Sequence, residues 1–307
     1  MTASAPRVGL ILPLFSGDPA KILATARSAE ELGYDGVFAF DHFFPPGAPA
    51  DRASVEVYTT LAAVAATTRR VTLGTLVTRA VLRPPGLVAK MVSTIDMVAG
   101  SGRMLVGVGS GDPIDEGEHR AYGFPMQSVR ERRAYLEEWV VAVRTILAGR
   151  PFAGSGRLTA VRGPLLPAPT VAPPLWVGGL ADDVVRIAAR SADGWNGWGV
   201  APDVFAAKAE LLREETARAG RAQVPEATWA GIVLVGEDEK EAASLAEQRR
   251  GKGVDALAWA GPAEEFPAFL RDLAAAGATW TILVLTGPPD RKDLVAELVL
   301  PHLTRPS

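Results

Sequence analysis

Short apolar runs alternate along the chain with longer segments in which apolar residues recur at helical spacing. Val8–Leu14 is an apolar run closed by Pro13 and Gly17, which is typical of a strand, and the next segment has the period of a helix. The predicted strands are Val8–Leu14, Gly36–Phe40, Val71–Thr75, Arg103–Val108, Leu175–Gly178, Gly194–Asn196, Thr228–Val235 and Trp280–Leu285. The predicted helices are Pro19–Gly33, Ser54–Thr67, Pro84–Val98, Arg130–Leu147, Ala181–Arg190, Pro202–Ala219 and Lys292–Leu303, with a helix-rich segment between Val235 and Ala276.

Strands that alternate with helices of this length predict parallel pairing through right-handed crossovers. We therefore expect an α/β fold, a single (β/α)8 TIM barrel that forms one domain over residues 1–307. A small excursion or hairpin at Phe152–Pro174 is expected between the fourth helix and the fifth strand. A doubly wound sheet is the alternative, but Leu10–Gly17 lacks the G-x-G-x-x-G turn that a dinucleotide needs after the first strand.

The composition narrows the class of protein. The 307 residues are 48% hydrophobic and 22% charged, which suits a large core. A net charge of −3 gives no basic excess for nucleic acid. The absence of cysteine excludes disulfides and thiolate metal sites, and three histidines are too few for a metal centre built on several of them. No apolar run approaches the ~18–20 residues that cross a bilayer. We expect a cytoplasmic protein that acts on a small molecule, with neither metal, nucleic acid nor membrane as partner.

In such a barrel the catalytic groups gather at the carboxyl ends of the strands. Asp41 and His42 follow the second predicted strand, among aromatic residues. A histidine there favours proton transfer, and the alternative is a histidine whose ring is satisfied by a neighbouring carbonyl. After the fourth strand, Gly107–Asp112 lets backbone approach a ligand and then presents a carboxylate, or forms only a turn.

Three further segments are candidates for ligand contact. Glycines at Val177–Leu180 open a helix whose N–H groups suit a phosphate ester, unless Asp182 or Asp183 caps that helix. Ala192–Trp198 is rich in aromatic and amide groups, although buried tryptophans are also common in cores. Thr72–Thr78 offers a flat backbone surface to an aromatic ring. The sequence contains no G-x-S-x-G, H-E-x-x-H or Walker A motif, so those mechanisms lack their usual residues.

Taken in order, these segments resemble the luciferase-like monooxygenase superfamily, in particular the branch that uses the deazaflavin coenzyme F420. The resemblance covers nearly the whole chain. The segments that carry it are Ala29–Val37 leading to Asp41-His42-Phe43, Arg70–Thr78 with Arg83-Pro84, Ser101–Gly111, and Trp176–Gly179 with Ala192–Asn196.

The resemblance implies a deazaflavin across the end of the barrel, its ring backed by a bulge in the third strand. That bulge would contain a non-prolyl cis peptide at Leu76–Val77. His42 and Asp112 would flank the redox carbon as catalytic residues, the acid being commonly a glutamate in the relatives. Phosphate and lactyl groups would lie along Val177–Leu180. The implied cofactor-binding residues are Asp41, Leu76, Val77, Thr78, Gly109, Ser110, Gly111, Asp115, Val177, Gly178, Gly179 and Leu180.

The implied substrate is apolar. The sugar-phosphate dehydrogenase of this branch has a tryptophan after the histidine, an acid in the first strand and lysines that hold phosphate. Those places hold Pro45-Pro46, Leu14-Phe15 and the lysine-free Gly197–Ala201. The substrate-contacting residues we predict for a hydrophobic or aromatic molecule are Phe15, Phe43, Phe44 and Trp198.

The first hypothesis is therefore an oxidoreductase that moves a hydride between coenzyme F420 and a small organic substrate. In this hypothesis His42 transfers the proton, and Asp112 polarises the substrate or donates a proton to it. An FMN-dependent monooxygenase is the first alternative, and a non-catalytic flavin- or deazaflavin-binding protein is the second, against which the His42–Asp112 pair counts. The habit of the family implies a homodimer.

Overall fold

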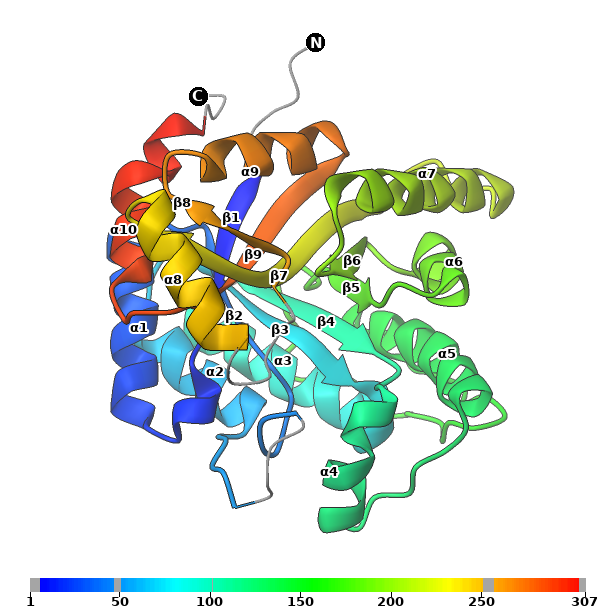
Figure 1. Cartoon of the computed structure of the whole chain (residues 1–307). Helices are drawn as coiled ribbons and strands as arrows, with labels where there is room; N and C mark the ends of the chain where they lie inside the picture. The colour runs from blue at the N-terminus through cyan, green and yellow to red at the C-terminus, as the bar shows by residue number, and fades with distance from the viewer. Residues whose placement is uncertain (1–5, 47–50, 101, 251–256, 304–307) are drawn as a thin grey trace.

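Eight parallel strands form a closed ring, and helices cover its outside (Figure 1). The computed structural model describes residues 6–46, 51–100, 102–250 and 257–303. Strand β1 pairs with β2 on one side and with β9 on the other, and β6 pairs with β7, which closes the ring. The strands of the ring are β1 (Arg7–Ile11), β2 (Gly36–Ala39), β3 (Thr72–Arg79), β4 (Met104–Gly109), β5 (Leu175–Gly178), β6 (Gly194–Trp198), β7 (Glu226–Gly236) and β9 (Ala278–Thr286). The predicted (β/α)8 barrel is thus confirmed.

The helices begin where the sequence provides capping residues. Asp18 accepts hydrogen bonds from the N–H groups of Ala20 and Lys21 at the start of the first helix, and Ser128 and Glu131 cap the longest one reciprocally. The α-helices are α1 (Pro19–Glu31), α2 (Val57–Thr67), α3 (Pro85–Ala99), α4 (Glu116–Ala121), α5 (Val129–Leu147), α6 (Asp182–Ser191), α7 (Pro202–Arg218), α8 (Glu239–Arg250), α9 (Phe266–Ala275) and α10 (Arg291–Leu298). The short 3₁₀ turns are η1 (Leu14–Ser16), η2 (Ala80–Leu82), η3 (Pro113–Asp115) and η4 (Leu300–His302).

Three aromatic side chains fill the interior of the ring. Phe38 on β2 lies with its ring centroid 5.9 Å from that of Trp176 on β5 and 5.5 Å from that of Trp280 on β9. These strands are not neighbours, so the side chains meet across the barrel. Glycines make the room, since a Cβ atom at Gly74 would lie 2.4 Å from Phe38 and one at Gly194 would lie 2.3 Å from Trp176.

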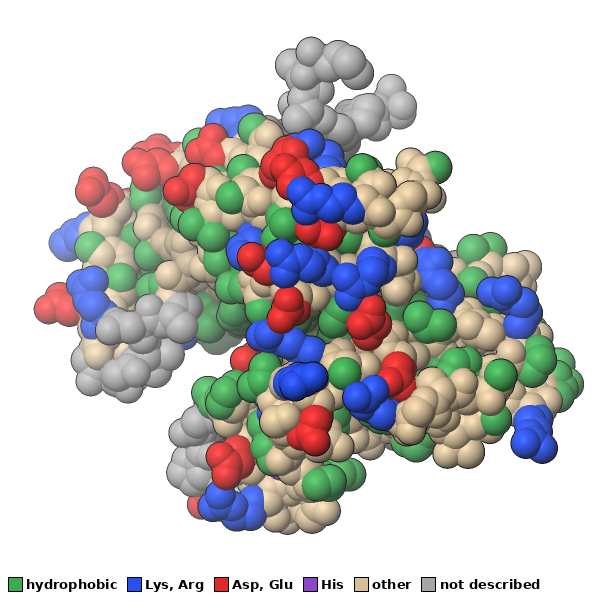
Figure 2. Space-filling view, turned by 90° about the vertical axis from the view of Figure 1, so that its right-hand side faces the viewer, with side chains coloured by type: hydrophobic (Ala, Val, Ile, Leu, Met, Phe, Trp, Pro, Cys, Tyr) green, Lys and Arg blue, Asp and Glu red, His purple; other side chains and the backbone are tan. Residues whose placement is uncertain are grey.

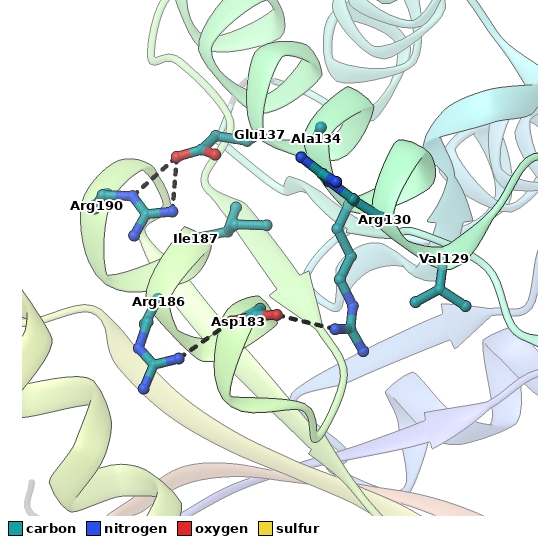
Figure 3. A pocket seen from close by; sticks show the side chains of 9 residues that line it. Val129, Arg130, Ala134, Glu137, Asp183, Arg186, Ile187 and Arg190 are labelled. Atoms are coloured by element: carbon teal, nitrogen blue, oxygen red, sulfur yellow. Dashed lines mark hydrogen bonds and ion pairs between the residues drawn. The ribbon is translucent and has the colours of Figure 1, made fainter.

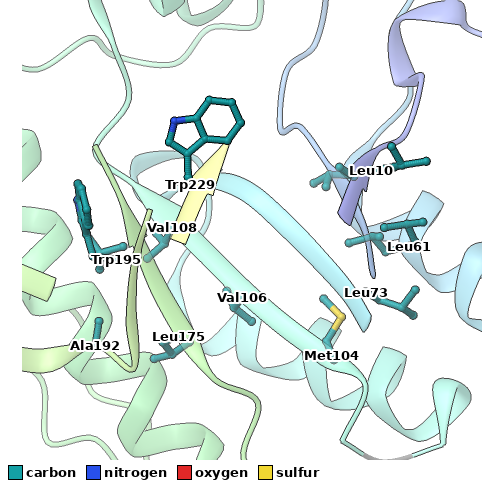
Figure 4. Packing of buried hydrophobic residues seen from close by; sticks show 14 of the residues in the cluster. Leu10, Leu61, Leu73, Met104, Val106, Val108, Leu175, Ala192, Trp195 and Trp229 are labelled. Carbon is teal, nitrogen blue, oxygen red and sulfur yellow. The ribbon is translucent and has the colours of Figure 1, made fainter. Parts of the chain in front are cut away.

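The outward side chains of the strands pack against the helices. Figure 4 shows part of this second core, in which Val106 and Val108 of β4 lie near Leu175 and Trp195, all of them buried. Because side chains alternate along a strand, Gly107, which lies between these two valines, faces the interior. It has no side chain, so β4 presents bare backbone to the interior near its carboxyl end.

The structure differs from the sequence prediction mainly in the strands and helices that lack a clear period. Two elements were not predicted, helix α4 and strand β8 (Trp259–Pro262). The strand lies inside the segment predicted to be helix-rich, of which residues 251–256 lie outside the described residues. It is four residues long, contains glycine and proline, and within the described ranges pairs with Val233–Gly236 of β7 alone, so tertiary pairing rather than local pattern creates it. Strand β3 runs to Arg79, beyond its predicted end at Thr75.

The irregular segment between α5 and β5 contains one isolated antiparallel bridge, between Phe152 and Val161, in place of a full hairpin. Its Leu166–Pro167 peptide is cis, and the carbonyl groups of both residues accept hydrogen bonds from Lys90 and Ser93 of α3. The segment therefore lies outside the barrel against α3. Across the described residues, no helix combines the length and apolar character that a membrane crossing needs.

Candidate functional site

His42 lies just beyond the carboxyl end of β2 and is held by a carboxylate from α4. Its Nδ1 atom is 2.6 Å from Oε1 of Glu118. An ionised carboxylate can only accept, so Nδ1–H is the donor, and Nε2 is left as the nitrogen that can exchange a proton. The side chain of His42 is 20% exposed, whereas that of Glu118 is 1% exposed. The structure thus presents an oriented imidazole on a buried anion.

Glu118 connects β2, β3 and α4 through a single carboxylate. Its Oε2 atom accepts the backbone N–H of Phe43 at 2.7 Å and the Nη2–H of Arg79 at 2.9 Å. Burial raises the pKa of Glu118, but the hydrogen bonds from His42 and Phe43 and the charge of Arg79 outweigh it, so the pKa lies below its ordinary value. Glu118 is therefore ionised at neutral pH.

Asp115, not Asp112, is the aspartate near this cluster. Its Oδ1 atom lies 3.8 Å from Nδ1 of His42 and 3.9 Å from Nη1 of Arg79. Its Oδ2 atom accepts the backbone N–H of Asp112 at 2.7 Å. Asp112 itself is exposed at the start of η3. The direct partner of His42 is Glu118, while the turn of η3 carries Asp112 outward and Asp115 inward; that Asp112 flanks the redox carbon stays a prediction.

Arg79 is the cation of the cluster. It is 3% exposed, its guanidinium lies 5.2 Å from the ring centroid of Phe43, and its Nε and Nη1 atoms have no hydrogen-bond partner among the described residues. His42, Asp115 and Glu118 each offer one ligand atom, and these atoms lie within 4.8 Å of one another. Because the guanidinium already lies against both carboxylates, the arrangement favours an internal ion network over a bound metal cation.

Two of the predicted cofactor contacts have their side chains committed elsewhere. The carboxylate of Asp41 accepts from Arg83 at 2.5 and 3.0 Å and from the backbone N–H of Arg79 at 3.2 Å. The hydroxyl of Thr78 is hydrogen-bonded to that of Tyr58 at 2.6 Å. Asp41 and Thr78 therefore stabilise the ends of β2 and β3, and their contact with a cofactor stays a prediction.

A bulge in β3 projects Val77 over bare backbone. The register to β4 shifts between Thr75 and Thr78, and the Leu76–Val77 peptide is cis, as the resemblance implies. A Cβ atom at Gly109 or at Gly178 would lie 2.8 Å from a methyl group of Val77. Leu76 is buried in the interior cluster. The glycines that the sequence assigned to ligand contact thus also have a structural reason, since they make room for Val77.

The loop after β4 is fixed by a buried arginine of α5. Arg132 donates from Nε to the carbonyl of Ser110 at 3.0 Å and from Nη2 to the carbonyl of Gly111 at 3.3 Å. Gly111 has a φ of +77°, and a Cβ atom there would lie 3.2 Å from Oδ2 of Asp115. Glycine is therefore required by the turn that brings Asp115 inward.

The start of α6 is uncapped. Its N-cap residue, Ala181, provides no side-chain hydrogen bond, so the alternative that Asp182 or Asp183 caps the helix is not what the structure shows. Asp182 pairs with Lys208 at 2.5 Å instead. The N–H of Gly179 donates to the carbonyl of Asn196, and Val177 is fully buried, so the N–H groups free to bind an anion lie at Leu180 and in the first helical turn.

The predicted substrate residues separate into two groups. Phe15 stacks on Phe40 at 5.8 Å between ring centroids, and Phe40 lies 6.2 Å from His42 and 5.7 Å from Trp198. The rings of Phe15, Phe40 and Trp198 thus form an aromatic cluster of three beside the imidazole.

The other predicted aromatic residues lie elsewhere. Phe43 packs on Tyr122 and Phe124. Phe44 is 6% exposed, so its predicted contact with a substrate stays a prediction.

Sequence reasoning missed Glu118, Arg79 and Phe40. Glu118 lies three residues after Asp115, a spacing that brings two side chains to one face of a helix, so both acids could have been predicted together. Arg79 follows the bulge of β3, and nothing local distinguishes it from a surface arginine. It meets Glu118 because β3 pairs with β4, and η3 and α4 follow β4 at the same end of the barrel.

Residues 4–282 match the family model described as luciferase-like monooxygenase. The chain therefore belongs to the luciferase-like monooxygenase family. An F420-dependent glucose-6-phosphate dehydrogenase of Beutenbergia cavernae is 34% identical over 58% of this chain and 52% of its own length, so the match spans about half of that relative. The uncharacterized protein Rv0940c of Mycobacterium tuberculosis is 31% identical over 63% of this chain and 71% of its own length.

Solved structures show the same fold at lower identity. An F420-dependent secondary alcohol dehydrogenase in complex with an F420-acetone adduct superposes with a TM-score of 0.84 at 20% identity, over 98% of this chain and 99% of that one. A coenzyme F420-dependent tetrahydromethanopterin reductase from Methanopyrus kandleri superposes with a TM-score of 0.75 at 19% identity, over 98% of this chain and 100% of that one. At these identities the likeness concerns the fold alone.

Proposed function

We propose that this protein is a coenzyme F420-dependent oxidoreductase that acts on a small hydrophobic or aromatic molecule. The observation that carries the proposal is the His42–Glu118 pair at 2.6 Å, beside the glycine-backed bulge of β3. The names of the relatives support the choice of cofactor, since F420 recurs among them.

The residues at this end of the barrel fit such a cofactor. A flat ring needs a level surface behind it. Val77 can lie low against β4 and β5 because Gly109 and Gly178 have no side chains, whereas a Cβ atom at either position would clash with a methyl group of Val77. An anionic group needs unpaired donors, which the uncapped start of α6 offers beyond Gly179. The bulge at Val77, packed on Gly109 and Gly178, would back the ring, and Leu180 with the first turn of α6 would hold the phosphate.

His42 moves the proton in this proposal. When bound, the deazaflavin supplies two-electron hydride chemistry, which leaves one proton to transfer. Nδ1–H of His42 is committed to Glu118, so Nε2 gives or takes that proton. Glu118 fixes the ring orientation and stabilises the imidazolium, while Arg79 keeps the carboxylate ionised. Asp112, which the sequence suggested as the second catalytic group, has an exposed position and no part in this proton path.

The aromatic cluster of Phe15, Phe40 and Trp198 argues for an apolar substrate. These rings lie beside the imidazole, and Trp198 is 38% exposed. A charged sugar phosphate would need cationic partners that none of these three residues provides. A ketone or alcohol with an apolar body would place its oxygen at His42 and its carbon chain on the aromatic rings.

Titration of the purified protein with F420, and separately with FMN, tests the cofactor. We expect the fluorescence signal to be quenched as F420 binds, with a micromolar or tighter Kd. FMN should bind more weakly. Turnover is then measured with apolar alcohols, ketones and enones, with glucose 6-phosphate as the control. Tighter binding of FMN would favour the monooxygenase alternative, and failure of both to bind would overturn the proposal.

A further inference from the structure

A groove with a volume of about 470 Å³ runs between α5 and α6 on the outside of the barrel. Figure 3 shows arginines from both helices extending into it, and Figure 2 shows basic and acidic side chains interspersed over this side of the molecule. The lining residues are Val129, Arg130, Arg133, Ala134, Glu137, Asp183, Arg186, Ile187 and Arg190. Four arginines thus face two carboxylates.

The two carboxylates do not neutralise the groove. Asp183 is shared by Arg133 at 3.0 Å and Arg186 at 3.1 Å. Glu137 pairs with Arg190 at 2.7 Å. Each guanidinium has five N–H donors, so these pairs leave most of the donors unused.

Arg130 is exposed and makes no hydrogen bond or ion pair with another described residue. It is the only one of the four arginines without a carboxylate in this part of the described chain. Arg186 also pairs with Glu215 at 3.4 Å, so the cation left free for a ligand is that of Arg130.

The groove begins where the proposed cofactor site ends. Helices α5 and α6 follow β4 and β5, so both start at the carboxyl end of the barrel (Figure 1). Asp182, the first residue of α6, comes two residues after Leu180, at which we place the phosphate. A ligand held there by its phosphate would continue outward along the groove between the two helices.

We propose that this groove binds the oligoglutamyl tail of coenzyme F420, which continues from the phosphate as a chain of carboxylates. The inference rests on the proposed function. Guanidinium groups match carboxylates in planar two-point contacts, and four of them along two helices suit a repeating anion better than a single one. The contacts are exposed and individually weak, so affinity would accumulate along the tail.

The test compares F420 that carries several glutamates with the phospholactyl deazaflavin that carries none. We expect the wild type to prefer the tailed form by about tenfold near 0.1 M salt and to lose this preference near 1 M, because the screening length falls from about 10 Å to about 3 Å. In Arg130→Ala/Arg133→Ala the preference should fall below about threefold, with the Kd of the tail-less form unchanged.

Two controls make the result specific. Arg213→Ala/Arg271→Ala removes the same charge from α7 and α9 and should keep the full preference. Arg130→Ala alone breaks no contact among described residues, so a reduced preference there cannot come from misfolding.

Equal Kd values for the two ligands in the wild type, or an unchanged preference in the double variant, would overturn the tail site alone. If the tail-less form binds, the proposed function survives that result. If neither form binds, the proposed function fails with it.

Discussion

The two sides of the carboxyl end of the barrel are built in different ways. On the β2–β4 side, residues from three segments form one hydrogen-bonded network. Buried Glu118 accepts hydrogen bonds from the side chains of His42 and Arg79 and from the backbone N–H of Phe43. On the β5–β6 side the surface is glycine backbone, an uncapped helix start and exposed arginines. The first arrangement fixes one side chain in one orientation, whereas the second offers many weak donors. The difference matches the tasks we propose, proton transfer on one side and binding of an anionic cofactor on the other.

Burial sets how much each charge matters. The Arg79–Glu118 pair has side chains that are 3% and 1% exposed, whereas those of the Arg190–Glu137 pair are 43% and 42% exposed. Water and salt screen the second pair and not the first. Substitutions on the two sides should therefore differ in both size and kind.

The largest effect is expected at His42. His42→Asn keeps some hydrogen bonding but removes the proton-transferring nitrogen, so kcat should fall by about 10²–10⁴-fold with little change in the Kd of F420. Steady-state kinetics on a substrate that turns over, with fluorescence titration alongside, measures both. Asp112→Asn is the matched control and should stay within about fivefold of wild type, because Asp112 is exposed. A larger loss at Asp112 than at His42 would reverse the assignment.

Arg79→Met should destabilise the fold by about 3 kcal/mol, since it leaves the buried Glu118 without its cation. Arg190→Met removes the exposed counterpart and should cost at most about 1 kcal/mol. Urea unfolding of the two variants under the same conditions measures the difference. Similar losses in both would show that burial does not separate the two sides.

Gly178→Ala tests the packing of Val77 on the glycine backbone of β5. The added methyl group would lie 2.8 Å from Val77, so we expect a loss of about 1–3 kcal/mol in unfolding free energy and weaker F420 binding. Gly163→Ala is the control, because nothing lies within 4 Å of the added Cβ atom there. Wild-type stability and affinity in Gly178→Ala would mean that the backbone at β5 adjusts freely.

The smallest effect concerns pH. The pKa of Glu118 is lower in the folded protein than its ordinary value of 4.5, so the ionised carboxylate stabilises the fold above that pH, and this stabilisation is lost as the pH falls through the folded-state pKa. In Glu118→Gln that loss is absent. The unfolding free energy of the variant should therefore fall less steeply below pH 4.5 than that of the wild type, which a series of urea titrations would show. Parallel slopes would contradict an ionised, hydrogen-bonded Glu118.

The period of the apolar residues was sufficient to predict the barrel, because each strand and its helix bury a face that local spacing reveals. It was also sufficient to place His42 at a strand end, and the resemblance located the bulge at Leu76–Val77, where the structure has it. Short elements were beyond such reasoning. Strand β8 and helix α4 carry four and six residues, too few to show a period.

The partners of His42 were decided only by tertiary structure. Asp112, Asp115 and Glu118 lie within seven residues of sequence, and which of them reaches the imidazole depends on the turn of η3 and the direction of α4. Arg79 is 39 residues away from Glu118 and meets it because β3 and the chain after β4 end on the same side of the barrel. A sequence specifies which charges exist, but the packing of strands and helices decides which of them are buried together, and hence which are strongly coupled.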